Sequence, residues 1–275
     1  MRIGTRGHDL PYTNAKSLME GCKRLGIETL QLALPKSFPD IDWQPGVFSP
    51  GLAAQIKREM DANGVQIPVL GCYIDPVHPD DAVRQAELNK FAEHMLFAKF
   101  LGADMIGTET GAYAGFGAAE SRSEAAYQRL VEGFRPLIAR AEKLGVMIGV
   151  EGVTGHTLYC PQRMQRFLQD LDSPNLFVIF DPVNLIDITN YRQQREIMDE
   201  VFSLYGDRIA ALHLKDFVIE DTAMRFCLAG DGLLDMAYLA NRIRAKKPGI
   251  DIILEEVPVH DWARVYAQVQ SHFHD

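Results

Sequence analysis

Four apolar stretches of the chain each end on a side chain that can bind a metal ion or move a proton. In chain order, these polar ends are Glu151, Asp181, His213 and Glu255. The residue before each polar end is large and apolar, and side chains alternate across a strand, so the four polar ends would share one face. Three carboxylates brought this close together need a cation between them. The pattern therefore predicts a divalent metal site, and three carboxylates with one imidazole suit Mn²⁺ or Mg²⁺, with Zn²⁺ or Co²⁺ as alternatives.

Two other interpretations of these residues stay open at this point. Each polar end, taken alone, could cap the helix that follows it. This alternative weakens for the set, because His213 is a poor cap and Glu255 is followed by another glutamate and not by a helix start. Glu256 competes with Glu255 for the ligand role. On a regular strand Glu256 would face the helices together with Leu254, so we assign the role to Glu255.

A repeating order of helix, glycine and apolar strand surrounds these residues. The predicted strands cover residues 2–6, 29–34, 66–74, 104–109, 146–151, 176–180, 209–213 and 251–255. The predicted helices cover residues 14–25, 51–63, 80–101, 123–144, 161–171, 191–204, 236–245 and 262–273. Strictly alternating strands and helices predict a parallel sheet. Eight such units predict a single (β/α)₈ TIM barrel domain over residues 1–275, since four successive strands of an open sheet would lie too far apart to share one ion. The long segments after the strands, including 217–235, are predicted to be loops at the active face.

Composition limits the partners of the chain. The 275 residues carry a net charge of −9 and no run of Lys or Arg, so a nucleic-acid partner is not expected. Four scattered cysteines without a Cys-x-x-Cys pair, and the lack of a signal segment or an apolar span, favour a cytoplasmic protein without a membrane partner. The oligomeric state stays open, with a homo-oligomer as one option.

Several short motifs point to one protein family. They are Val150-Glu151-Gly152, Asp181-Pro182-Val183-Asn184, His213-Leu214-Lys215-Asp216, the loop 230–235 (Gly-Asp-Gly-Leu-Leu-Asp) and Leu254-Glu255. Together they resemble the xylose isomerase-like barrels, a family of sugar and sugar-phosphate isomerases and epimerases that also holds an inosose dehydratase and a DNA-repair endonuclease. The resemblance implies a small carbohydrate substrate, and it places the family's four metal ligands on the same residues that strand alternation selects.

The chain also departs from some relatives. The endonuclease branch carries extra histidines for further metal ions, whereas this chain has Asn184 and Glu109 at the corresponding places. With the acidic net charge, these departures argue against a nuclease. Many sugar epimerases carry a glutamate at the end of strand two, where this chain has Gln31.

The chemistry of an isomerase fits the predicted site. A metal ion chelated by a sugar carbonyl and its neighbouring hydroxyl acidifies the C–H between them and stabilises an enediolate. Glu151 and Glu255 would flank the ion and act as acid and base, while Asp181 and His213 hold it. Lys215, two residues after His213, would face the same interior and could neutralise an enediolate or a phosphate.

Further polar residues at the mouth of the predicted barrel are candidates for substrate binding. They are Asn184, His156, Glu109, His8 and Arg225. Tyr113 and Phe116, in the glycine-rich segment 111–117, could close over a substrate.

The sequence thus predicts a metal-dependent isomerase or epimerase of a small sugar, sugar acid or sugar phosphate. One rival is a dehydratase of a cyclic polyol ketone. Another is a non-catalytic carbohydrate-binding barrel that kept the metal, although such a protein has no need of both Glu151 and Glu255.

Overall fold

The eight-stranded parallel sheet predicted above is present in the computed structural model, which describes residues 1–44, 46–111 and 117–274. Its strands are β1 (Arg2–Arg6), β2 (Leu30–Gln31), β3 (Val69–Gly71), β4 (Met105–Glu109), β5 (Met147–Glu151), β6 (Leu176–Phe180), β7 (Ile209–Leu214) and β10 (Asp251–Leu254). They follow the spatial order β2-β1-β10-β7-β6-β5-β4-β3. Isolated parallel bridges join Thr29 to Gln66 and Leu32 to Leu70, so the two ends of this order meet and the TIM barrel is nearly closed.

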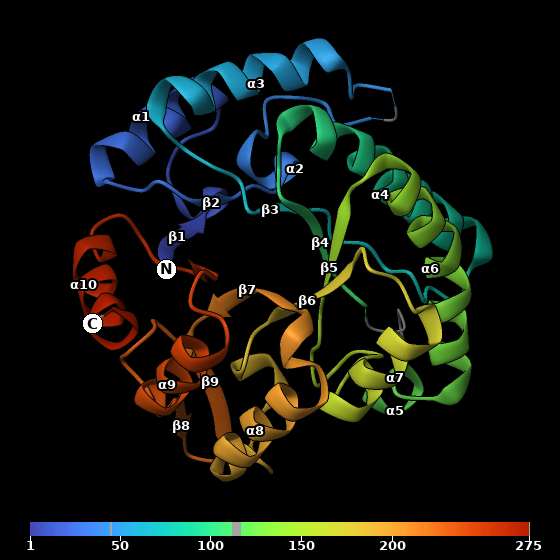
Figure 1. Cartoon of the computed structure of the whole chain (residues 1–275), viewed down its shortest axis with the longest axis vertical. Helices are drawn as coiled ribbons and strands as arrows, with labels where there is room; N and C mark the ends of the chain where they lie inside the picture. Colours follow the sequence, from blue (N-terminus) through green and yellow to red (C-terminus); the bar gives the residue numbers. More distant parts are fainter. Residues whose placement is uncertain (45, 112–116, 275) are drawn as a thin grey trace.

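Helices surround the strands (Figure 1). They are α1 (Ala15–Leu25), α2 (Leu34–Ser37), α3 (Pro50–Asn63), α4 (Asp81–Leu101), α5 (Ala118–Ser121), α6 (Glu124–Leu144), α7 (Pro161–Leu171), α8 (Gln194–Tyr205), α9 (Met236–Lys246) and α10 (Trp262–Phe273). Short 3₁₀ turns add η1 (Gly7–Asp9), η2 (Val183–Leu185), η3 (Tyr191–Gln193) and η4 (Gly206–Arg208). None of the helices in the described part of the chain is long and apolar enough to cross a membrane. The four cysteines are free thiols.

The conformation of the residue that ends each helix explains why a glycine stands between helix and strand in the sequence. Left-handed glycines end four of the predicted helices, and these residues are Gly26, Gly64, Gly102 and Gly145. A residue without a Cβ adopts this conformation at little cost. Gly206 differs, because it is right-handed and opens the turn η4, while α9 ends at Lys246 with Lys247 as its C-cap, before Gly249 is reached.

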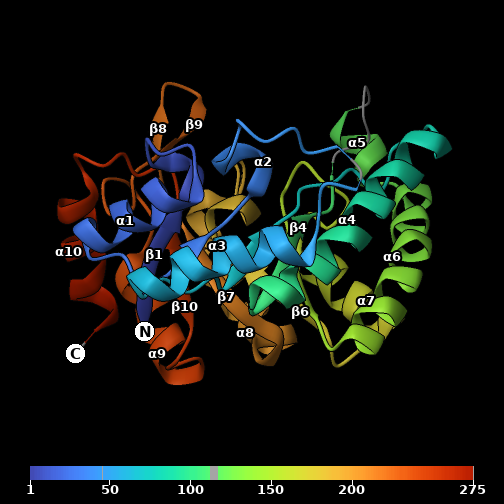
Figure 2. The same ribbon diagram turned by 90° about the horizontal axis from the view of Figure 1, so that it is seen from above.

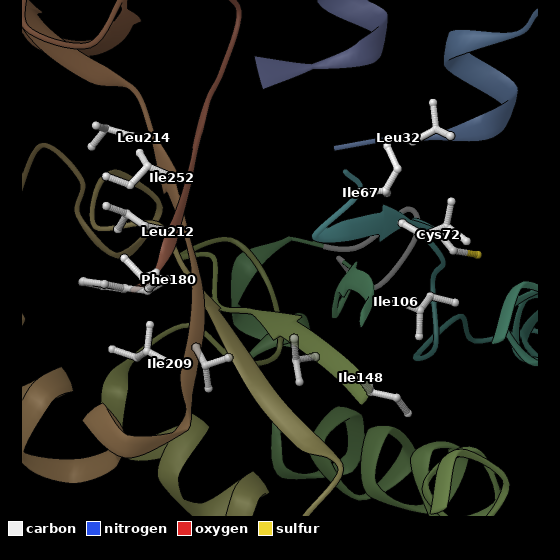
Figure 3. Packing of buried hydrophobic residues seen from close by; sticks show 14 of the residues in the cluster. Leu32, Ile67, Cys72, Ile106, Ile148, Phe180, Ile209, Leu212, Leu214 and Ile252 are labelled. Atoms are coloured by element: carbon white, nitrogen blue, oxygen red, sulfur yellow. The ribbon is translucent and has the colours of Figure 1, made fainter. Parts of the chain in front are cut away.

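Two apolar layers fill the barrel. The outer layer lies between strands and helices, and Figure 3 shows Phe180, Leu212, Leu214 and Ile252 together on one side of their strands. The inner layer consists of Val69, Met105, Ile179 and Ala211. Two inward-facing glycines leave room for Ile179, since a Cβ on Gly107 or Gly149 would come within 2.9 Å of its side chain. Because side chains alternate along each strand, this packing also determines that the polar residues at the strand ends point into the mouth of the barrel.

The structure differs from the sequence-based elements in two shortened strands and in segments that were predicted to be loops, where α2, α5 and a hairpin are formed. Strands β2 and β3 are shorter than predicted. Helix α2 begins at Leu34, within the range predicted for β2, and Pro68, just before β3, cannot donate a ladder hydrogen bond. The segment 217–235 is not only a loop. It contains the antiparallel hairpin of β8 (Asp216–Glu220) and β9 (Ala223–Cys227), which turns at left-handed Asp221. Figure 2 shows the hairpin at the same end of the barrel as α2 and α5, opposite the two termini.

Candidate active site

The four predicted ligands lie together at the carboxyl ends of their strands. Glu151 ends β5, Asp181 follows β6, His213 lies within β7 and Glu255 follows β10. All four are buried, with exposed fractions of 2%, 1%, 1% and 8% respectively. A buried group of this kind must be paired, so the contacts of each side chain decide what the site can do.

His213 is held between an amide and two carboxylates. Its Nε2 lies 2.6 Å from Oε1 of Gln31, an oxygen that can only accept, so Nε2 carries the proton. Its Nδ1 lies 3.0 Å from Oε2 of Glu151 and 3.3 Å from Oε1 of Glu255. Among the described residues, Nδ1 nevertheless has no well-aligned hydrogen-bond partner. The ring is therefore oriented by Gln31 with Nδ1 aimed at the carboxylates.

Lys215 is the cation that the structure places in this cluster. Its Nζ donates to Oδ2 of Asp181 at 2.5 Å and to Oε2 of Glu255 at 2.9 Å, and the residue is only 5% exposed. Arg6 adds a second positive charge at 3.4 Å from the other oxygen of Glu255. Glu255 is thus surrounded by donors on both oxygens.

Burial and charge act in opposite directions on these groups. Burial alone would lower the pKa of His213, but the charges of Glu151 and Glu255 outweigh it and raise the pKa to about 10. Burial alone would raise the pKa of Glu255, but His213, Lys215 and Arg6 together hold that pKa well below its usual range. Burial raises the pKa of Asp181 despite the opposing charge of Lys215. The cluster therefore works as one electrostatic unit.

Asp181 also has a structural task. Its Oδ1 accepts from the backbone N–H of Val183 at 2.8 Å and of Asn184 at 3.2 Å, which fixes the turn η2. Asp181 thus fixes a turn and does not cap a helix, since the next helix, α8, begins only at Gln194, and its other oxygen, Oδ2, faces Lys215 in the site. The same turn places Asn184, whose Nδ2 donates to Oε1 of Glu151 at 2.6 Å.

The donor set fits a divalent ion in its chemistry but not in its present arrangement. No group of three or more His, Cys, Asp or Glu side chains among residues 1–44, 46–111 and 117–274 stands in an arrangement that could hold a metal ion, and Lys215 takes up two of the carboxylates. The chemistry of the donors does fit such an ion, because they are three carboxylates and an imidazole. The unpartnered Nδ1 of His213, 99% buried, also fits, since its partner nitrogen is fixed as metal-binding histidines require.

A cavity of about 390 Å³ opens above this cluster. Its wall is made of Arg6, Lys36, Tyr73, Glu109, Val153, Asn184, Lys215, Phe226, Glu255 and Glu256. This volume is at the lower end of the range for small-molecule sites. Glu256 lies at the rim and not on the helix side, because the strand ends at Leu254 and Glu256 is left-handed, with φ 59°. Strand alternation therefore does not extend to Glu256, while Glu255 keeps its inward position.

Glu109 and His156 form a second polar pair at the mouth. His156 Nδ1 lies 3.5 Å from Oε2 of Glu109. Burial, followed by the charges of Glu151 and Glu255, raises the pKa of Glu109 to about 7. Burial lowers the pKa of His156. Glu109 can therefore carry a proton near neutral pH, in contrast to an ordinary glutamate.

Of the residues predicted to bind substrate, His156, His8 and Arg225 do not line this cavity. His8 lies in η1, and burial lowers its pKa to about 4. Arg225 lies on the hairpin strand β9, where its Nε pairs with Glu220 at 2.6 Å and its side chain is 67% exposed. Tyr113 and Phe116 lie outside the described residues.

Several residues of the site were not found from the sequence. Gln31 orients His213, Arg6 contacts Glu255, and Asp9 binds both Arg6 and the backbone N–H of Glu256. Tyr73 and Phe226 form parts of the wall. The position of Gln31 at the end of a strand could have indicated a role in the site, but its partner, His213, lies 182 residues away along the chain.

Comparisons with known proteins agree with this fold. Residues 19–273 match the family model of the xylose isomerase-like TIM barrel. An inosose dehydratase of Glaesserella parasuis serovar 5 (strain SH0165) is 23% identical, over 97% of this chain and 88% of the relative. The structure of a D-tagatose 3-epimerase-like protein superposes with a TM-score of 0.77 at 16% identity, covering 99% of this chain and 97% of the other. That of an IOLI protein with a binding zinc atom gives 0.73 at 14% identity, with both chains fully covered.

The family model spans more than nine-tenths of the chain. The chain belongs to the xylose isomerase-like TIM barrel family, which is also called the sugar phosphate isomerase/epimerase family.

Proposed function

We propose that the chain is a divalent-metal-dependent isomerase or epimerase of a small sugar, sugar acid or sugar phosphate. The observation that carries the proposal is the placement of Glu151 and Glu255 on either side of His213 Nδ1, at 3.0 Å and 3.3 Å. They come from the ends of β5 and β10, which β6 and β7 separate in the sheet. The two carboxylates therefore reach the centre from two sides.

Glu151, Asp181, His213 and Glu255 would hold the ion, with His213 using Nδ1. When bound, a divalent ion would polarise the carbonyl and the neighbouring hydroxyl of the sugar and acidify the C–H between them. One glutamate then takes the proton from carbon, and the other returns a proton to the opposite face or to the adjacent carbon. Lys215 lies beside two of these carboxylates, where its ammonium can balance negative charge that develops on a substrate oxygen.

The two-base assignment is tested by Glu151→Gln and Glu255→Gln. Each change keeps the size of the side chain and one oxygen but removes the base, so we expect metal to be retained and turnover to fall by at least ~10². Metal analysis, turnover and exchange of substrate C–H in D₂O are the measurements. Each single variant should still exchange deuterium from the face that keeps its base.

Glu256→Gln is the matched control, since Glu256 is the adjacent glutamate and its side chain is 62% exposed. It should stay active. A dead Glu256→Gln with a fully active Glu255→Gln would show that Glu256 is the reacting residue. Two active variants at positions 151 and 255 would rule out the two-base mechanism.

One observation favours a second candidate, a dehydratase of a cyclic polyol ketone. The raised pKa of Glu109, about 7, leaves a protonated carboxyl at the wall of the cavity. A glutamate that removes the C–H proton next to the ketone, with Glu109 donating a proton to the departing hydroxyl, would release water and leave an unsaturated ketone. Relatives named inosose dehydratase support this choice. An ultraviolet-absorbing product that wild type forms and Glu109→Gln does not would establish it.

A further inference from the structure

A second cavity adjoins the one above the cluster, and its wall is of another kind. It measures about 250 Å³ and is lined by Val153, Thr154, Val183, Asn184, Ile186, Asp187, Ile188, Ala223, Met224 and Phe226. Three of these residues, Val153, Asn184 and Phe226, also line the first cavity. The two hollows are therefore neighbours that share one wall, and we call the second one the annex.

Among the described residues, the wall of the annex is mainly apolar and contains no cation. Two of its three polar side chains are already engaged within the protein, and the third residue, Thr154, is uncharged and engaged through its backbone carbonyl. Asp187 Oδ1 accepts from the N–H and the hydroxyl of Thr189, Asn184 Nδ2 donates to Glu151, and the carbonyl of Thr154 accepts from Arg122. A phosphate or carboxylate would find no positive side chain among these wall residues.

Exposed apolar side chains mark the opening of the annex. Phe226 is 51% exposed and Ile188 is 40% exposed. Both belong to the few large apolar residues that are exposed on the described surface. Phe226 lies between the two cavities, with its ring centroid 5.0 Å from Lys215 Nζ. An apolar group bound in the annex would cover this surface.

We propose that the annex binds an apolar aglycone, so that the substrate is an alkyl or aryl glycoside whose sugar ring carries the ketone that the proposed chemistry needs, and not a free or phosphorylated sugar. The sugar ring would lie over the cluster in the first cavity, and its aglycone would pass Phe226 and contact Ile188 and Met224. This inference rests on the proposed function for the position of the sugar, but its test measures binding and needs no turnover.

The probes are phenyl glycosides of a panel of sugars, each compared with its methyl glycoside by titration calorimetry on the purified protein. We expect at least one phenyl glycoside to bind ~10-fold more tightly than its methyl counterpart, a difference of about 1.4 kcal/mol that burial of roughly 55 Å² of apolar surface supplies. Saturation transfer from the protein to the phenyl protons should accompany the binding.

Ile188→Asp places a charge in the annex at an exposed turn and should abolish the phenyl preference while methyl glycosides bind as before. Val83→Asp is the matched control, since Val83 is 42% exposed on α4 and lines neither cavity. It should keep the preference. Ala223→Trp should remove the preference by filling the annex.

The proposal is overturned if no phenyl glycoside of the panel binds, or if Ile188→Asp keeps the same phenyl preference as wild type. Loss of turnover in Glu151→Gln with an unchanged phenyl preference would support both proposals. Active glutamate variants with a phenyl preference would contradict the two-base chemistry alone, so the two failures can be told apart.

Discussion

Two histidines with almost the same burial have opposite electrostatics in this molecule. His213, at the carboxyl end of the barrel, is 1% exposed, and His94, in helix α4, is 2% exposed. The charges of two glutamates raise the pKa of His213 to about 10, although burial opposes them. Burial lowers the pKa of His94 to about 4. Burial alone therefore does not determine the charge of a buried group, and its neighbours do.

The surroundings of the two rings explain the difference. His94 Nδ1 lies 2.8 Å from the carbonyl of Lys90, and its ring lies 4.4 Å from that of Phe48, so the ring has a neutral acceptor and an apolar neighbour. His213 has one nitrogen on Gln31 and the other facing carboxylates. The helix layer thus keeps a neutral ring, whereas the barrel mouth keeps a set of charges that are stable only together.

The largest effect is expected from removing the central cation. Lys215→Met leaves Asp181 and Glu255 buried without their shared ammonium, so the free energy of unfolding of the metal-free protein should fall by ~3–5 kcal/mol. Denaturant unfolding in the presence of a chelator measures this loss. Lys57→Met is the control, because Lys57 makes a 2.8 Å pair with Asp61 at the surface, where such pairs contribute less than ~1 kcal/mol. Equal losses in the two variants would show that the central cluster does not depend on its cation.

The histidine of the helix layer makes stability depend on pH. The pKa of His94 is about 4 in the folded protein against 6.5 for the free side chain, so the unfolded chain binds the proton first as the pH falls. The contribution is fully present above pH 6.5 and is lost progressively down to pH 4. The difference between these two pKa values corresponds to about 3 kcal/mol of stability.

His94→Gln tests this dependence by difference. The variant cannot titrate, so its free energy of unfolding should fall by about 3 kcal/mol less than that of wild type between pH 7 and pH 4. Measuring the difference also removes the contribution of His8, whose pKa is lowered in both proteins. Parallel pH profiles would mean that His94 is solvated enough to keep its ordinary pKa.

Sequence patterns predicted the barrel and the four convergent side chains because both follow from local rules. Alternation along a strand decides which face Glu151 or His213 takes, and it needs no knowledge of the partner strand. The same rule could have revealed the hairpin, since residues 216–220 and 223–227 lie on either side of a two-residue turn. The rule did not extend to Glu256, because a left-handed residue ends the alternation.

Contacts across the barrel could not be predicted from the sequence, for a different reason. Gln31 meets His213, and Lys215 meets Asp181, only after the sheet has closed and brought distant strand ends together. The placement of Arg225 depended on which way a hairpin would fold, and the annex depended on three segments meeting around Phe226. Each of these features is a property of the assembled mouth and not of any single segment.

The smallest effect is expected from the contact that orients His213. Gln31→Leu removes the acceptor of Nε2–H at 2.6 Å, so the ring is no longer held with Nδ1 toward the carboxylates. Loss of such a supporting contact typically lowers metal affinity by ~10–100-fold. Calorimetric titration with Mn²⁺ measures it, and Gln31→Glu, which keeps an accepting oxygen, should lose less. Unchanged Mn²⁺ affinity in Gln31→Leu would mean that the carboxylates alone orient the ring. The contrast between the two histidines would then be weaker. His94 is held by a backbone carbonyl, which no substitution removes, and the orientation of His213 would likewise be insensitive to the loss of its side-chain acceptor.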